Sequence, residues 1–381
     1  MSAPSLTNAQ WMKPSYVNRS FVRYCAVPAA LCAMLFAFAA SAEPYLAVES
    51  GLKCMNCHVN PSGGGKRKEF GTLYARTQIS ANAVTLDSER KPWTGDITKW
   101  FAGGADVRAD YQSVDIPGSP TESDTELERA SVYAEFRAIP NLLSVYIDEK
   151  IAPDDAEMRE GYVLLTPKQG KYTIKAGQMF LPFGLRLQDD DAFVRQSSGI
   201  NFRTPEDGVE LGLELPKWST QLAMTDGSAS GGMGSLDRLS LSSVYVKPRW
   251  RVGASVNSND DPLGDRTMVG VFGGWKTGPI AWLAELDFIK DKPSSGDHDS
   301  YASLLEGNWR LHKGHNLKVS YEFLDPNRDR GEDQQERYSL VWEYSPIQFV
   351  QSRVGLRRYN GIPNFTASNR DEVFAELHVY F

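Results

Sequence analysis

The sequence predicts an all-β fold: a transmembrane antiparallel β-barrel of about 16 strands, preceded by a small N-terminal segment. Three observations predict it. Apolar and polar residues alternate in a series of short segments, the links between these segments are alternately short and long, and the last segment ends on the aromatic Phe381. No apolar run after residue 42 has the ~20 residues of a membrane-spanning helix, as expected when strands form the spans.

Residues 1–42 have the features of a secretory signal peptide. An apolar run at 26–40 ends in the small residues Ala40-Ser41-Ala42, and it follows the basic residues Lys13, Arg19 and Arg23. The run is shorter than the ~18 to 20 residues of a membrane anchor. We therefore expect an exported chain that begins near Glu43, with the translation start at Met1 or Met12 left open.

Residues 54–58 form a C-x-x-C-H motif. Two of the four cysteines, Cys25 and Cys32, lie in the predicted signal, so the exported chain keeps only Cys54 and Cys57, followed by His58. This spacing is typical of c-type haem attachment, because two thiols bond the haem vinyl groups and the adjacent histidine reaches the iron. The motif predicts one covalent haem c bound by Cys54, Cys57 and His58, with His58 as the metal ligand.

Other readings of the motif are weaker. A redox disulfide would favour a βαβ setting, whereas Gly, Pro and Lys surround this pair. Zinc would need further ligands, and the next histidine is His298. The sixth iron ligand stays open between a five-coordinate site and a set of distant candidates: Lys53, Asn60, Lys66, Lys68, Met158, Met179, Met224, Met233, Met268, His298, His312, His315 and His378.

Residues 43–98 form the predicted mono-haem, cytochrome c-like segment. Gly63-Gly64-Gly65 interrupts any continuous helix, and 68–77 could give one short helix. A segment below ~70 residues rarely buries enough apolar area unaided. We expect it to pack against the barrel, as a lumen plug.

Residues 99–381 form the predicted barrel. Alternation is clear in four segments: 106–111, 128–138, 280–288 and 317–323. The links after alternate segments are short, at 139–141, 166–170, 216–217, 247–248, 277–279, 312–314 and 345–346. The others are long, at 113–125, 152–157, 181–207, 227–237, 257–265, 291–299, 325–335 and 360–369. Outer-membrane barrels have short periplasmic turns and long outward loops. A soluble β-sandwich or propeller gives no reason for the links to fall into two length classes.

The last segment, 371–381, places Val373, Ala375, Leu377 and Val379 on one face before Phe381. A terminal aromatic residue on an alternating strand resembles the assembly signal of bacterial outer-membrane barrels. An even strand number puts both barrel ends on the periplasmic side, so we expect the haem segment there or in the lumen of an outer-membrane protein. Lumen-facing charges, such as those of Arg108, Arg129, Arg137, Lys175, Arg353 and Arg357, could be only a solvated inner wall.

The whole mature chain resembles the fused outer-membrane cytochrome–porins in its order of signal, C-x-x-C-H and barrel. At motif level the resemblance depends on Cys54, Cys57 and His58; the run GQMFLPFG at 177–184 is similar to a segment of phosphate-selective porins. The resemblance implies electron transfer between an extracellular donor or acceptor, such as a metal ion, and a periplasmic c-type cytochrome or similar carrier. It also implies extracellular Fe(II) oxidation as an activity, outer-membrane lipid as the surroundings and, by analogy with porins, a homo-trimer.

Three functions are therefore compared: an electron conduit, a solute-diffusion porin with a haem-bearing plug or sensor, and a plain porin with a Cys54–Cys57 disulfide. The net charge of −7 and the lack of a basic stripe argue against a nucleic-acid partner. Two acidic stretches, Asp189–Asp191 and Asp297–Asp299, are candidate metal-collecting sites, although acidic loops are often only solvated.

Overall fold

A computed structural model describes residues 43–84, 92–227, 236–260, 264–293, 296–363 and 365–381. The predicted signal peptide, residues 1–42, lies outside the described residues. Among the residues described, no helix is both long enough and apolar enough to cross a membrane.

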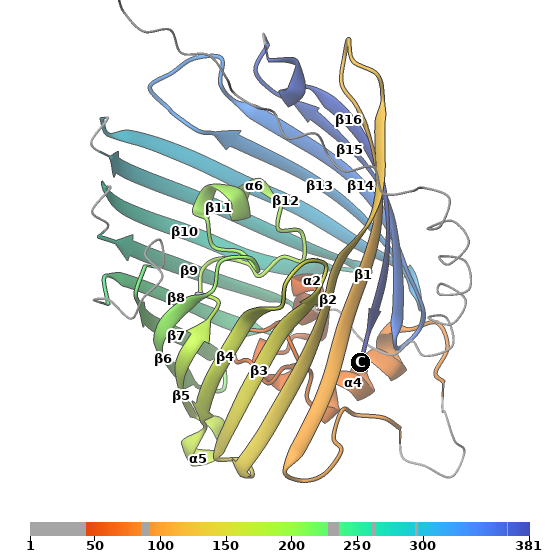
Figure 1. The fold of residues 1–381 in the computed structure, drawn as a ribbon, viewed down its shortest axis with the longest axis vertical. Coiled ribbons are helices and arrows are strands. Elements are labelled where there is room, and N and C mark those ends of the chain that lie inside the picture. Colours follow the sequence, from red (N-terminus) through yellow and green to blue (C-terminus); the bar gives the residue numbers. More distant parts are fainter. Residues whose placement is uncertain (1–42, 85–91, 228–235, 261–263, 294–295, 364) are drawn as a thin grey trace, which may run out of the picture. The chain divides into compact units, whose positions relative to one another are not determined.

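Sixteen antiparallel strands form one closed barrel, which confirms the predicted fold class (Figure 1). Neighbours in sequence are neighbours in the sheet, and β1 closes the ring on β16 with pairs such as Val107↔Val379. The strands are β1 (Phe101–Asp115), β2 (Glu122–Ile139), β3 (Leu143–Ala152), β4 (Glu157–Leu165), β5 (Tyr172–Met179), β6 (Glu206–Glu214), β7 (Trp218–Thr225), β8 (Arg238–Lys247), β9 (Trp250–Asn259), β10 (Gly264–Thr277), β11 (Ile280–Pro293), β12 (His298–His312), β13 (His315–Asp325), β14 (Gln335–Ile347), β15 (Val350–Asn360) and β16 (Arg370–Tyr380).

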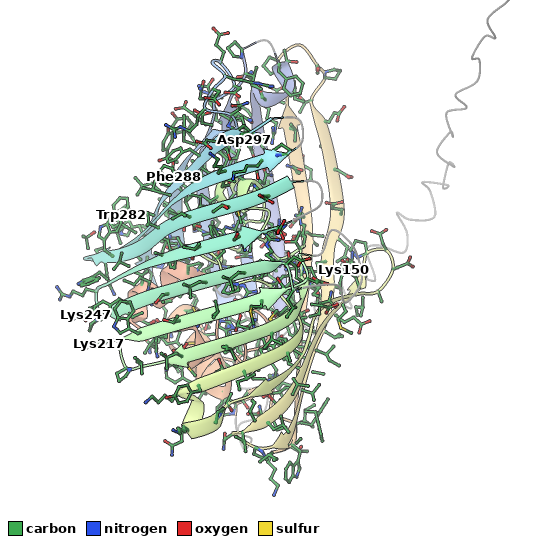
Figure 2. The ribbon with its side chains drawn as sticks, turned by 90° about the vertical axis from the view of Figure 1, so that its left-hand side faces the viewer. Lys150, Lys217, Lys247, Trp282, Phe288 and Asp297 are labelled. Atoms are coloured by element: carbon green, nitrogen blue, oxygen red, sulfur yellow. The ribbon has the colours of Figure 1, made fainter. Side chains whose placement is uncertain are left out.

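The alternation along each strand separates an apolar outer face from a polar lumen. On β11, Leu286 and Phe288 are exposed outward while Glu285 and Asp287 are fully buried inside. Lys217 and Lys247 lie at the short-turn end of the wall, and Lys150 and Asp297 lie toward the end with the long links (Figure 2). This is the arrangement of a barrel whose outer surface faces lipid.

Two predicted links differ from the structure. The link at 113–125 is mostly strand, since β1 runs to Asp115 and β2 begins at Glu122. The segment 181–207 was expected to be an outward loop, but residues 180–205, including α6 (Phe193–Ser198), fold into the lumen (Figure 1). Buried contacts with the wall hold this segment, which we call the inward loop.

Residues 43–84, which we call the plug, contain α2 (Pro44–Ser50), α3 (Cys54–Cys57), α4 (Glu69–Tyr74) and the π-helical turn η1 (Ala75–Ile79). Inward-facing wall residues bind the plug: the Tyr45 hydroxyl donates to Glu343, and the Tyr146 hydroxyl accepts from the Lys66 amide at 2.9 Å. At the rim, the Ala81 amide donates to the Ser345 carbonyl at 2.8 Å. The small segment therefore buries its apolar residues against the barrel.

Candidate functional site

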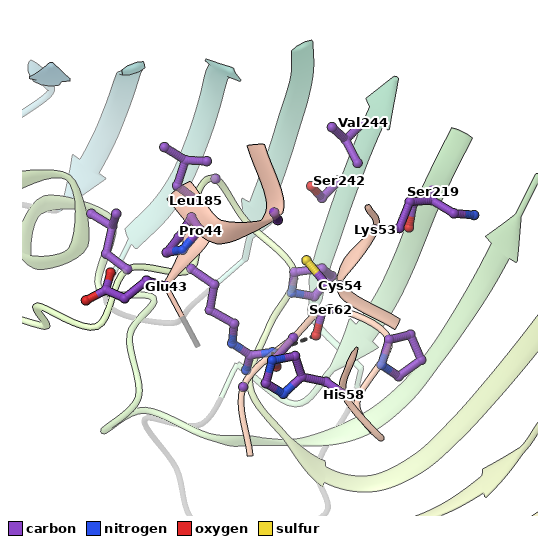
Figure 3. Close-up of a pocket in the computed structure, with 18 of the residues that line it drawn as sticks. Glu43, Pro44, Lys53, Cys54, His58, Ser62, Leu185, Ser219, Ser242 and Val244 are labelled. Carbon is purple, nitrogen blue, oxygen red and sulfur yellow. Dashed lines mark hydrogen bonds between the residues drawn. The ribbon is translucent and has the colours of Figure 1, made fainter. Parts of the chain in front are cut away.

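A large cavity lies between the plug, the inward loop and the lumen wall formed by β7–β10 (Figure 3). Its empty volume is about 1470 Å³, part of which is open to solvent. Many lining residues are apolar, including Leu46, Leu181, Phe183, Leu185, Ile200, Val244 and Phe272.

The three motif residues, Cys54, Cys57 and His58, all line this cavity. They are brought together by α3, because residues three apart in a helical turn share a face. The His58 amide then donates to the Cys54 carbonyl at 3.0 Å, which fixes the histidine directly after the turn. Cys54 and His58 lie close together in Figure 3, with Ser62 beside them.

The glycine run after the motif is needed for this packing. Gly63, Gly64 and Gly65 all have positive φ angles, of 94°, 78° and 59°, which favour glycine. A Cβ atom at Gly63 would lie 3.3 Å from the Cys54 Cβ and 3.5 Å from its Sγ. The run therefore returns the chain across the motif, so close to Cys54 that a side chain at Gly63 would crowd it.

Burial favours the uncharged forms of the His58 and Cys57 side chains. His58 is 6% exposed, and its Nδ1 atom is buried without a well-formed hydrogen bond to any described residue, although the carbonyls of Gly64 and Gly65 face the ring. Burial, helped by the charge of Arg67, lowers the pKa of His58 to about 3, and burial raises the pKa of the Cys57 thiol. Neutral imidazole is the form that binds metal.

These features fit the c-type haem that the motif predicts. The thiols and the imidazole share one cavity, and the wall around them is largely apolar. The cavity also contains cations that suit the two carboxylates of a haem: Lys53, Arg67, Arg186, Arg195 and Arg251.

The sixth-ligand candidates are scattered. Of those in the described parts of the chain, Lys53 is the one that lines the cavity, and its ammonium group pairs with Glu214 at 2.6 Å. His378 is fully buried and bonds Asp106 at 2.8 Å. Asn60 instead bonds Glu160 and Lys175 on the wall. Met233 lies outside the described residues.

The acidic stretch Asp189–Asp191 does not lie in an outward loop. It belongs to the inward loop, where the Asp189 carboxylate accepts from Arg337 and Arg357, each at 2.8 Å. Asp189 therefore fastens the loop to the wall. The second stretch lies at the start of β12, where His298 lies 3.6 Å from Asp291.

Sequence reasoning missed the contribution of the inward loop to the cavity. Eight consecutive loop residues, from Phe180 to Leu187, line it. One signal could have revealed them: Leu181, Phe183, Leu185 and Leu187 give an apolar alternation that is unusual for a solvated loop.

No protein-family model matches the chain, and neither does any curated protein. Solved structures do. An anion-selective porin from Comamonas acidovorans aligns with a TM-score of 0.59 at 10% identity, covering 74% of this chain and 99% of that one. A loop L8 deletion mutant of OmpT, an outer membrane protein of Vibrio cholerae, aligns with a TM-score of 0.55 at 12% identity, covering 74% of this chain and 99% of that one. The trimer form of OmpT aligns with a TM-score of 0.54 at 11% identity, covering 74% of this chain and 100% of that one. The chain thus has a porin-type outer-membrane barrel fold.

Proposed function

We propose that this chain is an outer-membrane electron-transfer protein with one covalent c-type haem, which passes electrons between an extracellular donor or acceptor and a periplasmic carrier. The observation that supports it most is the convergence of Cys54, Cys57 and His58 on one largely apolar cavity within the barrel. In this proposal Cys54 and Cys57 anchor the haem and His58 ligates its iron. The bound haem would supply one-electron redox chemistry.

The position of the cavity supports a conduit. The apolar band of a barrel is ~25 Å tall, and electron tunnelling falls steeply with distance, so a haem outside the periplasmic rim would be too far from an extracellular partner. A haem between the plug and the inward loop lies inside the barrel instead. The resemblance to fused cytochrome–porins extends the proposal to Fe(II) as the extracellular donor and a c-type cytochrome as the periplasmic acceptor.

An optical spectrum tests the haem. Full-length protein, matured in a host that attaches c-type haem, should show a Soret band and a reduced-minus-oxidised difference spectrum. Cys54→Ala with Cys57→Ala should lose both, whereas the matched pair Cys25→Ala with Cys32→Ala should keep them because both residues lie in the predicted signal. A colourless wild-type protein would contradict the proposal.

A second candidate function is a solute-diffusion porin with a haem-bearing plug or sensor, and the porin-type fold favours it. Planar-bilayer conductance separates the two. A conduit should reduce its haem from an impermeant outside donor while passing little ion current. An open pore with an inert haem would favour the porin. A homo-trimer, by analogy with the trimer form of OmpT, is tested by the mass of the detergent complex.

A further inference from the structure

Arg186 connects the inward loop to the plug beside the motif. Its Nη1 atom donates to the Ser62 hydroxyl at 2.6 Å and to the Gly63 carbonyl at 2.8 Å. The guanidinium carbon also lies 5.3 Å and 5.1 Å from the ring centres of Phe180 and Phe202. The side chain is therefore held rigidly at the cavity wall, which Arg186, Ser62 and Gly63 all line.

The second nitrogen of this guanidinium group is not satisfied. Arg186 Nη2 is buried and makes no hydrogen bond to any residue that the structure describes. The carboxylate of Glu160 lies 4.0 Å away, and it already accepts from the Asn60 side chain and the Phe180 amide. Burying a donor without a hydrogen-bond partner is unfavourable, and more so in a charged group.

Three of the other four cavity cations have carboxylate or carbonyl partners, and the fourth, Arg67, has its guanidinium carbon 5.5 Å from the centre of the Tyr380 ring. The guanidinium of Arg195 pairs with the Glu285 carboxylate, and Lys53 pairs with Glu214. Arg251 of β9 donates to the carbonyls of Ala47 and Leu52 in the plug. Arg186 thus combines a fixed position, a positive charge and a buried donor without a bond, which is the geometry of a recognition group for an anion.

We propose that Arg186 Nη2 binds a carboxylate of the molecule that occupies this cavity. The inference rests on the proposed function, in which that molecule is haem and the carboxylate is one of its propionates. Arg186 is then a positioning residue, which orients the haem and joins plug, haem and inward loop through one side chain.

The charge of Arg186 has a measurable effect on the redox equilibrium. A propionate without its cation adds a negative charge near the iron, which favours the oxidised state. Arg186→Gln should therefore lower the reduced-to-oxidised ratio at a fixed potential about tenfold, or ~59 mV for a one-electron couple. Arg186→Lys keeps the charge but loses the planar fork, and should recover part of the shift.

The experiment is a spectroscopic redox titration of the full-length holoprotein. Arg203→Gln is the matched control, because Arg203 is on the same loop with its side chain 61% exposed, and it should leave the titration unchanged. Arg251→Gln tests the competing cation. The assignment would be overturned if Arg186→Gln carries haem but its redox potential is unshifted, or if the potential shifts in Arg251→Gln and not in Arg186→Gln. A wild type without haem would instead overturn the proposed function itself.

A second measurement decides the question if Arg186→Gln fails to mature. Full-length protein with Cys54→Ala and Cys57→Ala keeps His58 and the cavity, and it can be titrated with ferric protoporphyrin IX and with its dimethyl ester, which lacks both carboxylates. We expect the free acid to bind about tenfold tighter, and Arg186→Gln in this background to remove the preference. Equal affinities before that substitution would overturn the proposal.

Discussion

The plug and the inward loop both occupy the lumen and both form ion pairs with the wall, but the chain connects them to the barrel differently. The inward loop joins strands at both of its ends, and its ion pairs are those of Asp189 with Arg337 and Arg357, and of Arg195 with Glu285. The plug joins the barrel only on its C-terminal side, and its ion pairs include Lys53 with Glu214 and Glu43 with Lys318.

This difference indicates which of the two can move. When its contacts with the wall break, a segment fixed at one end gains more conformational freedom than a loop fixed at both ends. We therefore expect the inward loop to be the fixed part of the lumen and the plug to be the part that loosens first.

The largest effect should come from Arg195→Met. This substitution leaves Glu285 buried without its cation, at a cost of about 3–5 kcal/mol, and the inward loop should detach from β11. Planar-bilayer recordings should then show a clear rise in ion conductance, while Arg203→Gln leaves it unchanged. Equal conductance of Arg195→Met and wild type would show that the loop is not held by this pair.

Asn60→Ala should loosen the plug and spare the loop. The fully buried Asn60 donates to Glu160 at 2.9 and 3.1 Å and accepts from Lys175 at 3.2 Å. Its loss should cost about 1–3 kcal/mol of plug docking and speed amide hydrogen exchange in residues 43–84 but not in the strands. The exposed Gln78→Ala is the control. Faster exchange throughout the barrel would contradict a separable plug.

A pH titration should also distinguish the plug from the inward loop, with a smaller effect than either of these substitutions. Burial raises the pKa of Glu43 to about 7, despite the nearby Lys318. Burial also raises the pKa of Asp189, but Arg337 and Arg357 outweigh it and hold that pKa below its usual value. The contribution of Glu43 to plug docking is thus fully present below pH 4.5, the ordinary Glu pKa, and is lost as the pH rises through about 7. His58 acts in the opposite direction, because its lowered pKa gives a contribution that is lost as the pH falls below 6.5, the ordinary His pKa. The contribution of Asp189 to loop docking is lost only in strong acid.

Spin labels can follow this difference. A label at Gln78 in the plug should gain mobility between pH 5 and about pH 7.5, and a label at Arg203 in the inward loop should not. Both labels are placed in a Cys54→Ala, Cys57→Ala, His58→Gln background, which removes the opposing titration of His58. Glu43→Gln should flatten the response of the plug. A pH response that survives Glu43→Gln would show that another group is responsible.

The barrel can be predicted from the sequence because strand alternation is a local pattern, and the motif can be recognised because it is a short contiguous stretch. Alternation along 280–288 and 317–323 indicates which side chains face outward, and the motif Cys54, Cys57 and His58 is contiguous. The inward loop was wrongly expected outside, since its position depends on pairs such as Asp189 with Arg337, which are 148 positions apart. A solvated inner wall was one reading of the lumen charges, but Lys175 and Arg353 among them are buried and paired. Nothing local marks Arg186 as a cavity residue.

The pairing of β1 with β16 determines when the barrel can close during its assembly. The ring closes only when Phe381 has been made, because the Phe381 amide and carbonyl bond Ala105 across that seam. Under the proposed function, attachment enzymes would have to reach Cys54 and Cys57 before the closed ring encloses the plug.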